Sequence, residues 1–200
     1  AFPEATKYDM THLIPAAFGI ILLLVYLQLR GFGGVVGTFI TILLSIISAM
    51  GIAGWMGIRL TPPAMSAPTI ILTLAVADCV HILSNWMHKV RTGEHRKAAM
   101  RESLRINFSP VFLTSLTTAI GFMSLNFSDA PPFHDLGNIA AMGVMFAWFY
   151  SIFFLPALVS ILPVTEKKEH TLGTQMMNRF AEWVIRSRGF LLPSMSILIL

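Results

Sequence analysis

The stretch that decides the fold is LTLAVADCVHIL, residues Leu72 to Leu83, a mostly apolar run that contains one aspartate, Asp78. It lies inside a longer segment, Ala67–Met87, which holds no other Asp, Glu, Lys or Arg. About 20 apolar residues are enough for a helix to cross the hydrocarbon core of a bilayer. An acidic residue at the centre of such a helix costs about 3 kcal/mol on insertion scales. The segment therefore predicts a membrane-spanning helix whose buried carboxyl group needs an explanation.

The composition places the whole chain in the membrane class. Of its 200 residues, 55% are hydrophobic and 12% are charged, and the mean hydropathy is +0.71. Soluble domains carry about 25% charged residues. The net charge of +4 comes from basic residues that flank apolar segments and form no basic groove. We therefore expect membrane lipids around the chain and no nucleic-acid partner.

Five segments are long and apolar enough to span a membrane. They are Leu13–Leu29, Gly33–Gly57, Ala67–Met87, Phe108–Phe127 and Leu136–Leu162, and a sixth begins near Gly189. Helices are expected for all of them because a helix satisfies its own backbone hydrogen bonds in lipid. The predicted fold class is an all-α, polytopic transmembrane helical bundle with five spans and the start of a sixth.

Four regions follow from this pattern. Residues 12–163 form the predicted transmembrane core, 164–188 a cytoplasmic amphipathic linker helix, and 189–200 the start of the next span, while 1–11 lead into the core. The chain begins with alanine and ends in an apolar run of 12 residues, which is too short to cross a bilayer. We therefore expect the chain to be a piece of a longer protein.

The basic residues predict the orientation. Twelve of the 14 Lys and Arg residues lie at Arg30 or in segments 88–107 and 164–188, which helix counting places on one side. Only Lys7 and Arg59 lie on the other side. Because basic loops remain in the cytoplasm, segments 88–107 and 164–188 are predicted to be cytoplasmic. Residues 94–107 and 174–188 are also amphipathic, which is typical of helices that lie along the membrane surface.

Asp78 is the strongest candidate for a functional residue. A helix places Asp78, His81, Asn85 and His88 on one face, which leads from the middle of the span towards the predicted cytoplasmic end. Because a carboxyl group can bind and release a proton, this polar stripe fits a proton path. Alternatively, Asp78 makes a static interhelical hydrogen bond, His81 packs against a neighbouring helix, and Asn85 is an interfacial polar group.

The fourth predicted span offers partners for Asp78. Small and polar residues recur there at spacings of three and four, namely Thr114, Thr117, Gly121, Ser124 and Ser128. Such a face allows close helix packing. It would also allow Thr117 or Thr118 to form a hydrogen bond with the Asp78 carboxyl or with a nearby water molecule.

The sequence carries no motif of a catalytic or metal centre. It has no nucleophile elbow, phosphate-binding loop, HExxH motif or cysteine pair. His81 and His88 lie near Asp78, but no second cluster of ligands faces them. We therefore expect no enzyme activity, no metal and no cofactor. Cys79, the single cysteine, is expected to behave as a small apolar residue.

Three stretches resemble the membrane core of the resistance-nodulation-division (RND) superfamily. They are VADCVHIL, AAMRESLRINFSPV and TSLTTAIGFMSLNFSDAPPFHDLGNIAAMGV. The resemblance is to the MMPL-type branch of hydrophobe and amphiphile exporters, which is related to sterol-sensing and Patched-like domains. It implies a protein of twelve spans in two pseudo-repeats, each with a large extracytoplasmic domain after its first helix. The five spans would be helices two to six, forming half of this arrangement, and residues 1–11 would be the exit from the first domain.

The resemblance also implies a function. Members of this superfamily are driven by the proton-motive force in a bacterial inner membrane, and Asp78 matches the motif position of their proton-relay acid. Cys79 stands where the family often has a second acid or a tyrosine. The implied partners are a hydrophobic or amphiphilic substrate and the second repeat of the same protein. The resemblance leaves open whether the protein forms an oligomer. The alternatives are a sterol-sensing-type lipid-binding receptor or scaffold and a protein-secretion accessory of the same superfamily.

Overall fold

The computed structural model of the chain describes residues 14–29, 32–161, 179, 182–183 and 186–187. The chain divides into two units, Ala1–Glu166 and Lys167–Leu200, and the helical core lies in the first. The predicted entry segment 1–11, nearly all of the linker 164–188, and the predicted span start 189–200 lie outside the described residues.

The described part of the first unit is a bundle of long helices without a strand. The helices are α2 (Ile14–Leu29), α3 (Phe32–Trp55), α4 (Ala67–Arg91), α5 (Arg96–Met123), α6 (Pro131–Phe149) and α7 (Leu155–Ile161). Short 3-10 turns, Ala64–Ser66 and Ser124–Phe127, precede α4 and follow α5. Each of the five predicted spans corresponds to a helix or a continuous helical run, which confirms the all-α bundle.

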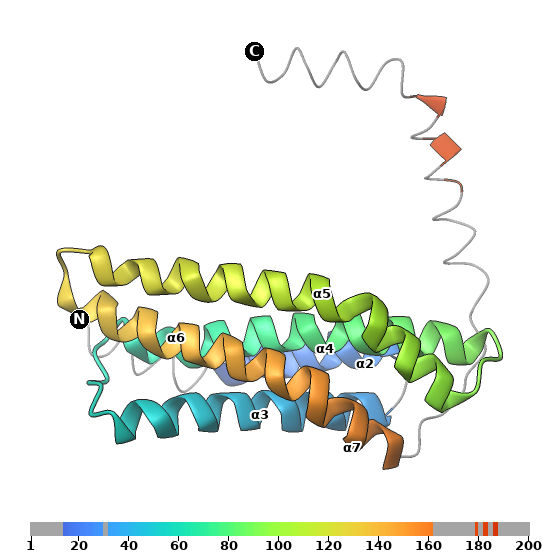
Figure 1. The fold of residues 1–200 in the computed structure, drawn as a ribbon, viewed down its shortest axis with the longest axis horizontal. Helices are drawn as coiled ribbons and strands as arrows, with labels where there is room; N and C mark the ends of the chain where they lie inside the picture. The colour runs from blue at the N-terminus through green and yellow to red at the C-terminus, as the bar shows by residue number, and fades with distance from the viewer. Residues whose placement is uncertain (1–13, 30–31, 162–178, 180–181, 184–185, 188–200) are drawn as a thin grey trace. The chain divides into compact units, whose positions relative to one another are not determined.

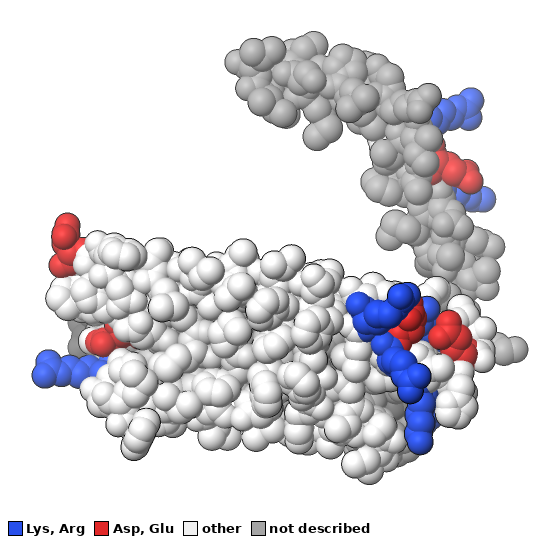
Figure 2. All heavy atoms as spheres, in the orientation of Figure 1, with Lys and Arg blue, Asp and Glu red and all other residues white. Residues whose placement is uncertain are grey.

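Length and apolar composition suit the bundle to a membrane. Four helical stretches meet the requirements for crossing one, namely Phe32–Trp55, Ala64–Arg91, Arg96–Phe127 and Pro131–Ile161. Helix α2 contains a shorter apolar segment, Phe18–Leu27. On the face that the space-filling view shows, the charged side chains of the bundle lie at its two ends, and none is seen between them (Figure 2). This distribution is the one expected of helices that pass through hydrocarbon.

The helices run lengthwise beside one another (Figure 1). Helices α4 and α6 each pack against several of the other helices. Helix α6 packs against α3, α4 and α5, whereas α4 also packs against α2. Small residues at every fourth position line the buried face of α3, namely Gly33, Gly37, Thr41, Ser45, Ala49 and Ala53. A similar row lines α5, namely Ala99, Ser103, Asn107, Val111, Ser115 and Ala119. Such rows let helices approach closely where hydrophobic burial supplies no driving force between them.

Gly143 marks one of these close approaches. A Cβ atom at this position of α6 would overlap the side chain of Ile71 in α4 and lie 3.3 Å from Cβ of Ala49 in α3. Ile71 and Ala49 are both fully buried. The absence of a side chain at Gly143 therefore lets α6 lie against α3 and α4 together.

The basic amphipathic segment 94–107 is not a separate interfacial helix. From Arg96 onward it is continuous with the span in α5, which includes Pro110 and changes direction partway along its length (Figure 1). Ala99 and Ser103 are buried, and the Trp86 indole Nε1 donates to the carbonyl of Arg96 at 3.2 Å. The segment packs against α4 because its small residues continue the four-residue row of the span.

Helix α6 continues through a π-helical turn, Tyr150–Phe154, into α7. Pro156 follows this turn and has no N–H group to donate to the carbonyl of Ile152, so a regular α-helical bond is unavailable there. A π turn is a common way for a helix to absorb such an interruption. The hydroxyl groups of Tyr150 and Ser48 lie 2.8 Å apart and connect this turn to α3.

Candidate functional site

Asp78 lies near the middle of α4 and is buried, with 7% of its surface exposed. The hydroxyl group of Ser115 in α5 donates a hydrogen bond to its Oδ2 atom at 3.4 Å. This is long for a hydrogen bond between two oxygens, which usually measures about 2.5–3.0 Å. The Asp78 carboxyl is therefore held loosely at the interface between α4 and α5.

The carboxyl has unused hydrogen-bonding capacity. Within the described residues, the bond from Ser115 is the only one that Asp78 makes, and no lysine or arginine there forms an ion pair with it. An ionised carboxylate offers about four lone-pair sites for hydrogen bonds. The arrangement leaves room for a proton, a water molecule or a further side chain at Asp78.

Cys79, the next residue, faces a different helix. It is fully buried, and Thr38 and Thr41 of α3 lie beside its thiol. The hydroxyl of Thr38 donates within its own helix to the carbonyl of Gly34 at 2.9 Å. Cys79 is therefore a packing residue between α3 and α4, while Asp78 faces α5.

A second polar cluster links α4 and α5 nearer to the basic loop. The Asn85 amide Nδ2 donates to Oδ1 of Asn107 at 3.0 Å, and Nδ2 of Asn107 donates to the carbonyl of Ser103 at 2.8 Å. The Ser103 hydroxyl in turn donates to the carbonyl of Ile82 at 2.6 Å. This amide cluster (Asn85, Asn107 and Ser103) fastens the two helices about two turns from Asp78.

An apolar layer separates the two polar groups. Ile82 lies between Asp78 and Asn85 along α4, and Val111 lies between Ser115 and Asn107 along α5. Both side chains are buried. Buried apolar side chains therefore lie between the two polar groups in the helix interface, while His81 of the predicted stripe lies on the exposed face of α4 at the same depth.

The predicted hydroxyl partners are arranged differently from Ser115. The Thr117 hydroxyl is exposed and donates to the carbonyls of Leu113 and Thr114 in its own helix. Thr118 is half-buried, and in the described part of the chain the Asp78 carboxyl is bonded by Ser115 instead. The face that contains Thr114, Thr117 and Gly121 points out of the described bundle.

Sequence reasoning missed Ser115, Asn107 and Ser103. A signal was present, because these residues belong to the four-residue row from Ala99 to Ala119, which is as regular as the neighbouring face with its threonines. Periodicity alone does not say which of two polar faces turns inward.

We expect Asn107→Leu to destabilise the bundle by about 1 kcal/mol, because it removes the interhelical hydrogen bond and leaves the Asn85 amide with only its 3.3 Å bond to the carbonyl of His81 in its own helix. The unfolding midpoint of the purified intact protein in detergent measures this change. Thr117→Val is the matched control, since its hydroxyl bonds only within α5. Equal midpoints for the two variants would contradict a structural role for the amide cluster.

Groups of three or more His, Cys, Asp or Glu side chains that could hold a metal ion do not occur among the residues that the structure describes. The site therefore consists of one buried carboxyl, one hydroxyl and an amide cluster, all at the interface of two membrane helices. This chemistry suits the transfer of a proton.

Comparison with known proteins places the chain in a family. The model of the MMPL family matches residues 1–188. A protein from Methanocaldococcus jannaschii that is named as a membrane protein is 26% identical over 120 residues. The match covers 60% of this chain but 31% of that protein, so the chain spans less than a third of the length of this relative. The chain belongs to the MMPL family.

Proposed function

We propose that this chain is the membrane part of an exporter that the proton-motive force drives, with Asp78 as its proton carrier. The cargo is hydrophobic or amphiphilic, and the protein lies in the cytoplasmic membrane, the inner membrane in bacteria. The observation that supports this most strongly is the Asp78 carboxyl itself, buried in a span with one long hydrogen bond. Ionisable residues inside membrane helices are expensive and usually serve ion or proton pathways.

Protonation of Asp78 would act through helix packing. The neutral carboxyl tolerates an apolar surrounding, whereas the ionised form needs water or a cationic partner. Because α4 packs against α3, α5 and α6, a change in its position or rotation reaches most of the bundle. The second repeat of the intact protein would supply the remaining relay groups, and alternation between two packings would move the cargo.

The proton would leave Asp78 towards the basic end of the bundle. If loop 88–107 is cytoplasmic, as its charge indicates, the amide cluster of Asn85, Asn107 and Ser103 lies on the cytoplasmic side of Asp78. Amide groups can hold water molecules there, and the buried side chains of Ile82 and Val111 lie between this cluster and Asp78 along the two helices. His81 lies on the exposed face of α4, so a proton could pass through its imidazole and bypass these apolar side chains.

The experiment that tests the proposal measures export by the intact protein in energised vesicles with and without Asp78→Asn. Loss of export with normal folding supports the proton carrier. Export by the variant at the wild-type rate would remove Asp78 from the mechanism, whereas no proton-driven export by the wild-type protein would favour the other function considered, a lipid-binding receptor or scaffold.

A second variant tests His81. We expect His81→Gln to change the dependence of export on pH, because glutamine keeps a polar side chain but cannot bind and release a proton. The measurement is the initial export rate against cytoplasmic pH. His134→Gln is the control, since His134 bonds the carbonyl of Ser128 at the opposite end of the bundle. An unaltered profile for His81→Gln would exclude His81 from the relay.

A further inference from the structure

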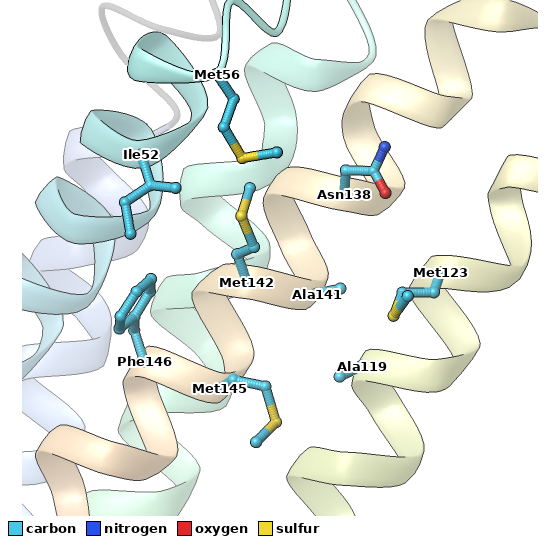
Figure 3. A pocket seen from close by; sticks show the side chains of 9 residues that line it. All are labelled: Ile52, Met56, Ala119, Met123, Asn138, Ala141, Met142, Met145 and Phe146. Carbon is cyan, nitrogen blue, oxygen red and sulfur yellow. The ribbon is translucent and has the colours of Figure 1, made fainter.

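A pocket of about 430 Å³ opens between α3, α5 and α6 (Figure 3). Its volume lies in the usual range for small-molecule sites, about 300–1,000 Å³. Ala119 of α5 and Ala141 of α6 line its floor and are 4% and 5% exposed. Met56 and Met123 line it near the helix ends and are 61% and 54% exposed. The pocket is therefore a recess with a buried floor and an accessible rim.

The lining is suited to an apolar chain. It contains four methionines and no titratable residue, and methionine side chains adapt to ligands of irregular or variable shape. Asn138 is its one amide, and Asn138 and Asn126 exchange two hydrogen bonds, at 3.0 and 3.1 Å. A charged ligand would find no counter-charge here, whereas a hydrocarbon chain would leave no polar group unpaired.

The position of the pocket determines what can reach it. It extends along the C-terminal parts of α3 and α5 and along α6 from Asn138 to Phe146, in the half of the bundle away from the basic loop. These helices belong to stretches that can cross a membrane, and the face of the bundle shown in Figure 2 carries no charge between its two ends. The rim therefore opens where the bundle would meet the acyl chains of one leaflet.

We propose that this pocket binds one acyl chain of a bilayer lipid from the leaflet at the Arg59 end of the bundle. The recess is apolar and lies between stretches that can cross a membrane, and its floor is lined by the small side chains of two alanines, which suits a single acyl chain. A role of this pocket in handling export cargo rests on the proposed function. Binding of a lipid chain in the pocket does not depend on that function.

The test uses the intact protein in liposomes that contain phosphatidylcholine with a photoactivatable diazirine near the end of one acyl chain. After illumination without a proton gradient, mass spectrometry locates the label. We expect label at Ala141 and at the half-buried Met145, because a chain reaches the buried Ala141 only by entering the pocket. Label confined to the exposed rim would overturn the proposal and would indicate that another segment of the intact protein fills the recess.

Two variants make the result specific. Ala119→Phe should fill the floor and lower labelling of α6 there by about tenfold, which corresponds to ~1.4 kcal/mol. Gly121→Phe is the matched control, because Gly121 lies at nearly the same depth of α5 and has open space around it. If Ala119→Phe does not fold, Ala141→Leu fills the same floor with a smaller group, and labelling is then read at Met145. Undiminished labelling in a folded pocket variant would overturn the proposal.

This experiment separates the pocket from the proton relay. Labelling needs neither a gradient nor the Asp78 carboxyl, so Asp78→Asn should show the same label as the wild type. Loss of export in Asp78→Asn together with normal labelling supports both proposals. Unchanged export in that variant with floor labelling would leave the lipid site standing and remove the proton carrier.

Discussion

Changing Asp78 to asparagine is expected to reduce proton-driven export by the intact protein to the level of vesicles that lack the protein. Asparagine has nearly the shape of aspartate and can still accept the hydrogen bond from Ser115. It cannot bind and release a proton. The loss would therefore report the proton itself and not a change in packing.

The same change should leave the fold intact or make it more stable. An acidic residue in the middle of a span costs about 3 kcal/mol on insertion scales, and a neutral amide avoids that cost. Membrane insertion, monodispersity in detergent and the unfolding midpoint are the measurements. Asp129→Asn is the matched control, because it makes the identical chemical change at an exposed position between α5 and α6 and should keep full export. Export by Asp78→Asn at the wild-type rate would exclude Asp78 as the carrier.

The largest effect on stability is expected from Gly137→Ala, at about 1–3 kcal/mol or more. A Cβ atom at Gly137 of α6 would overlap the backbone carbonyl oxygen of Phe122 in α5 and lie 3.0 Å from Cβ of Leu125. A flexible side chain could move aside, but a helix backbone cannot do so without shifting α5 relative to α6. Because both helices line the pocket, this shift should also disturb the pocket.

Gly121→Ala is the matched control for this prediction. Gly121 precedes Phe122 in α5, and a Cβ atom there would have no neighbour within 4 Å. Since alanine favours a helix by up to about 1 kcal/mol over glycine, this variant should be as stable as the wild type or more stable. Unfolding midpoints of the two purified variants in the same detergent give the comparison. A Gly137→Ala protein as stable as Gly121→Ala would contradict the close contact of α5 and α6.

Much of the fold could be predicted from the sequence because spanning a membrane imposes a strong local constraint. Residues 33–57 and 67–87 are mostly apolar, and the structure forms helices α3 and α4 there. The boundaries were less predictable at α5. There, the basic residues from Arg96 to Arg105 resembled a surface helix, yet the small residues Ala99 and Ser103 join the span. The charged residues make this segment look like a surface helix when the sequence is read alone. Its small buried residues decide which helix it packs against.

The candidate site could be predicted only in its central residue. Asp78 stands out because it is the one charged residue in its span, and no tertiary information is needed to notice it. Its hydroxyl partner was not identifiable in this way. Ser115 and Thr118 lie three residues apart on the same helix, and a small rotation of α5 decides which of them meets α4.

The sequence by itself determined the class of the protein, its spanning segments and the acidic residue in the membrane, because each depends on the transfer of local segments from water to hydrocarbon. The tertiary structure decided which face of each helix is buried. It therefore decided that Ser115 bonds Asp78, that Ile82 and Val111 separate this pair from the amide cluster, and that three helices leave a pocket. These features depend on how small residues let neighbouring helices approach and rotate, and helices far apart in the chain contribute to each of them.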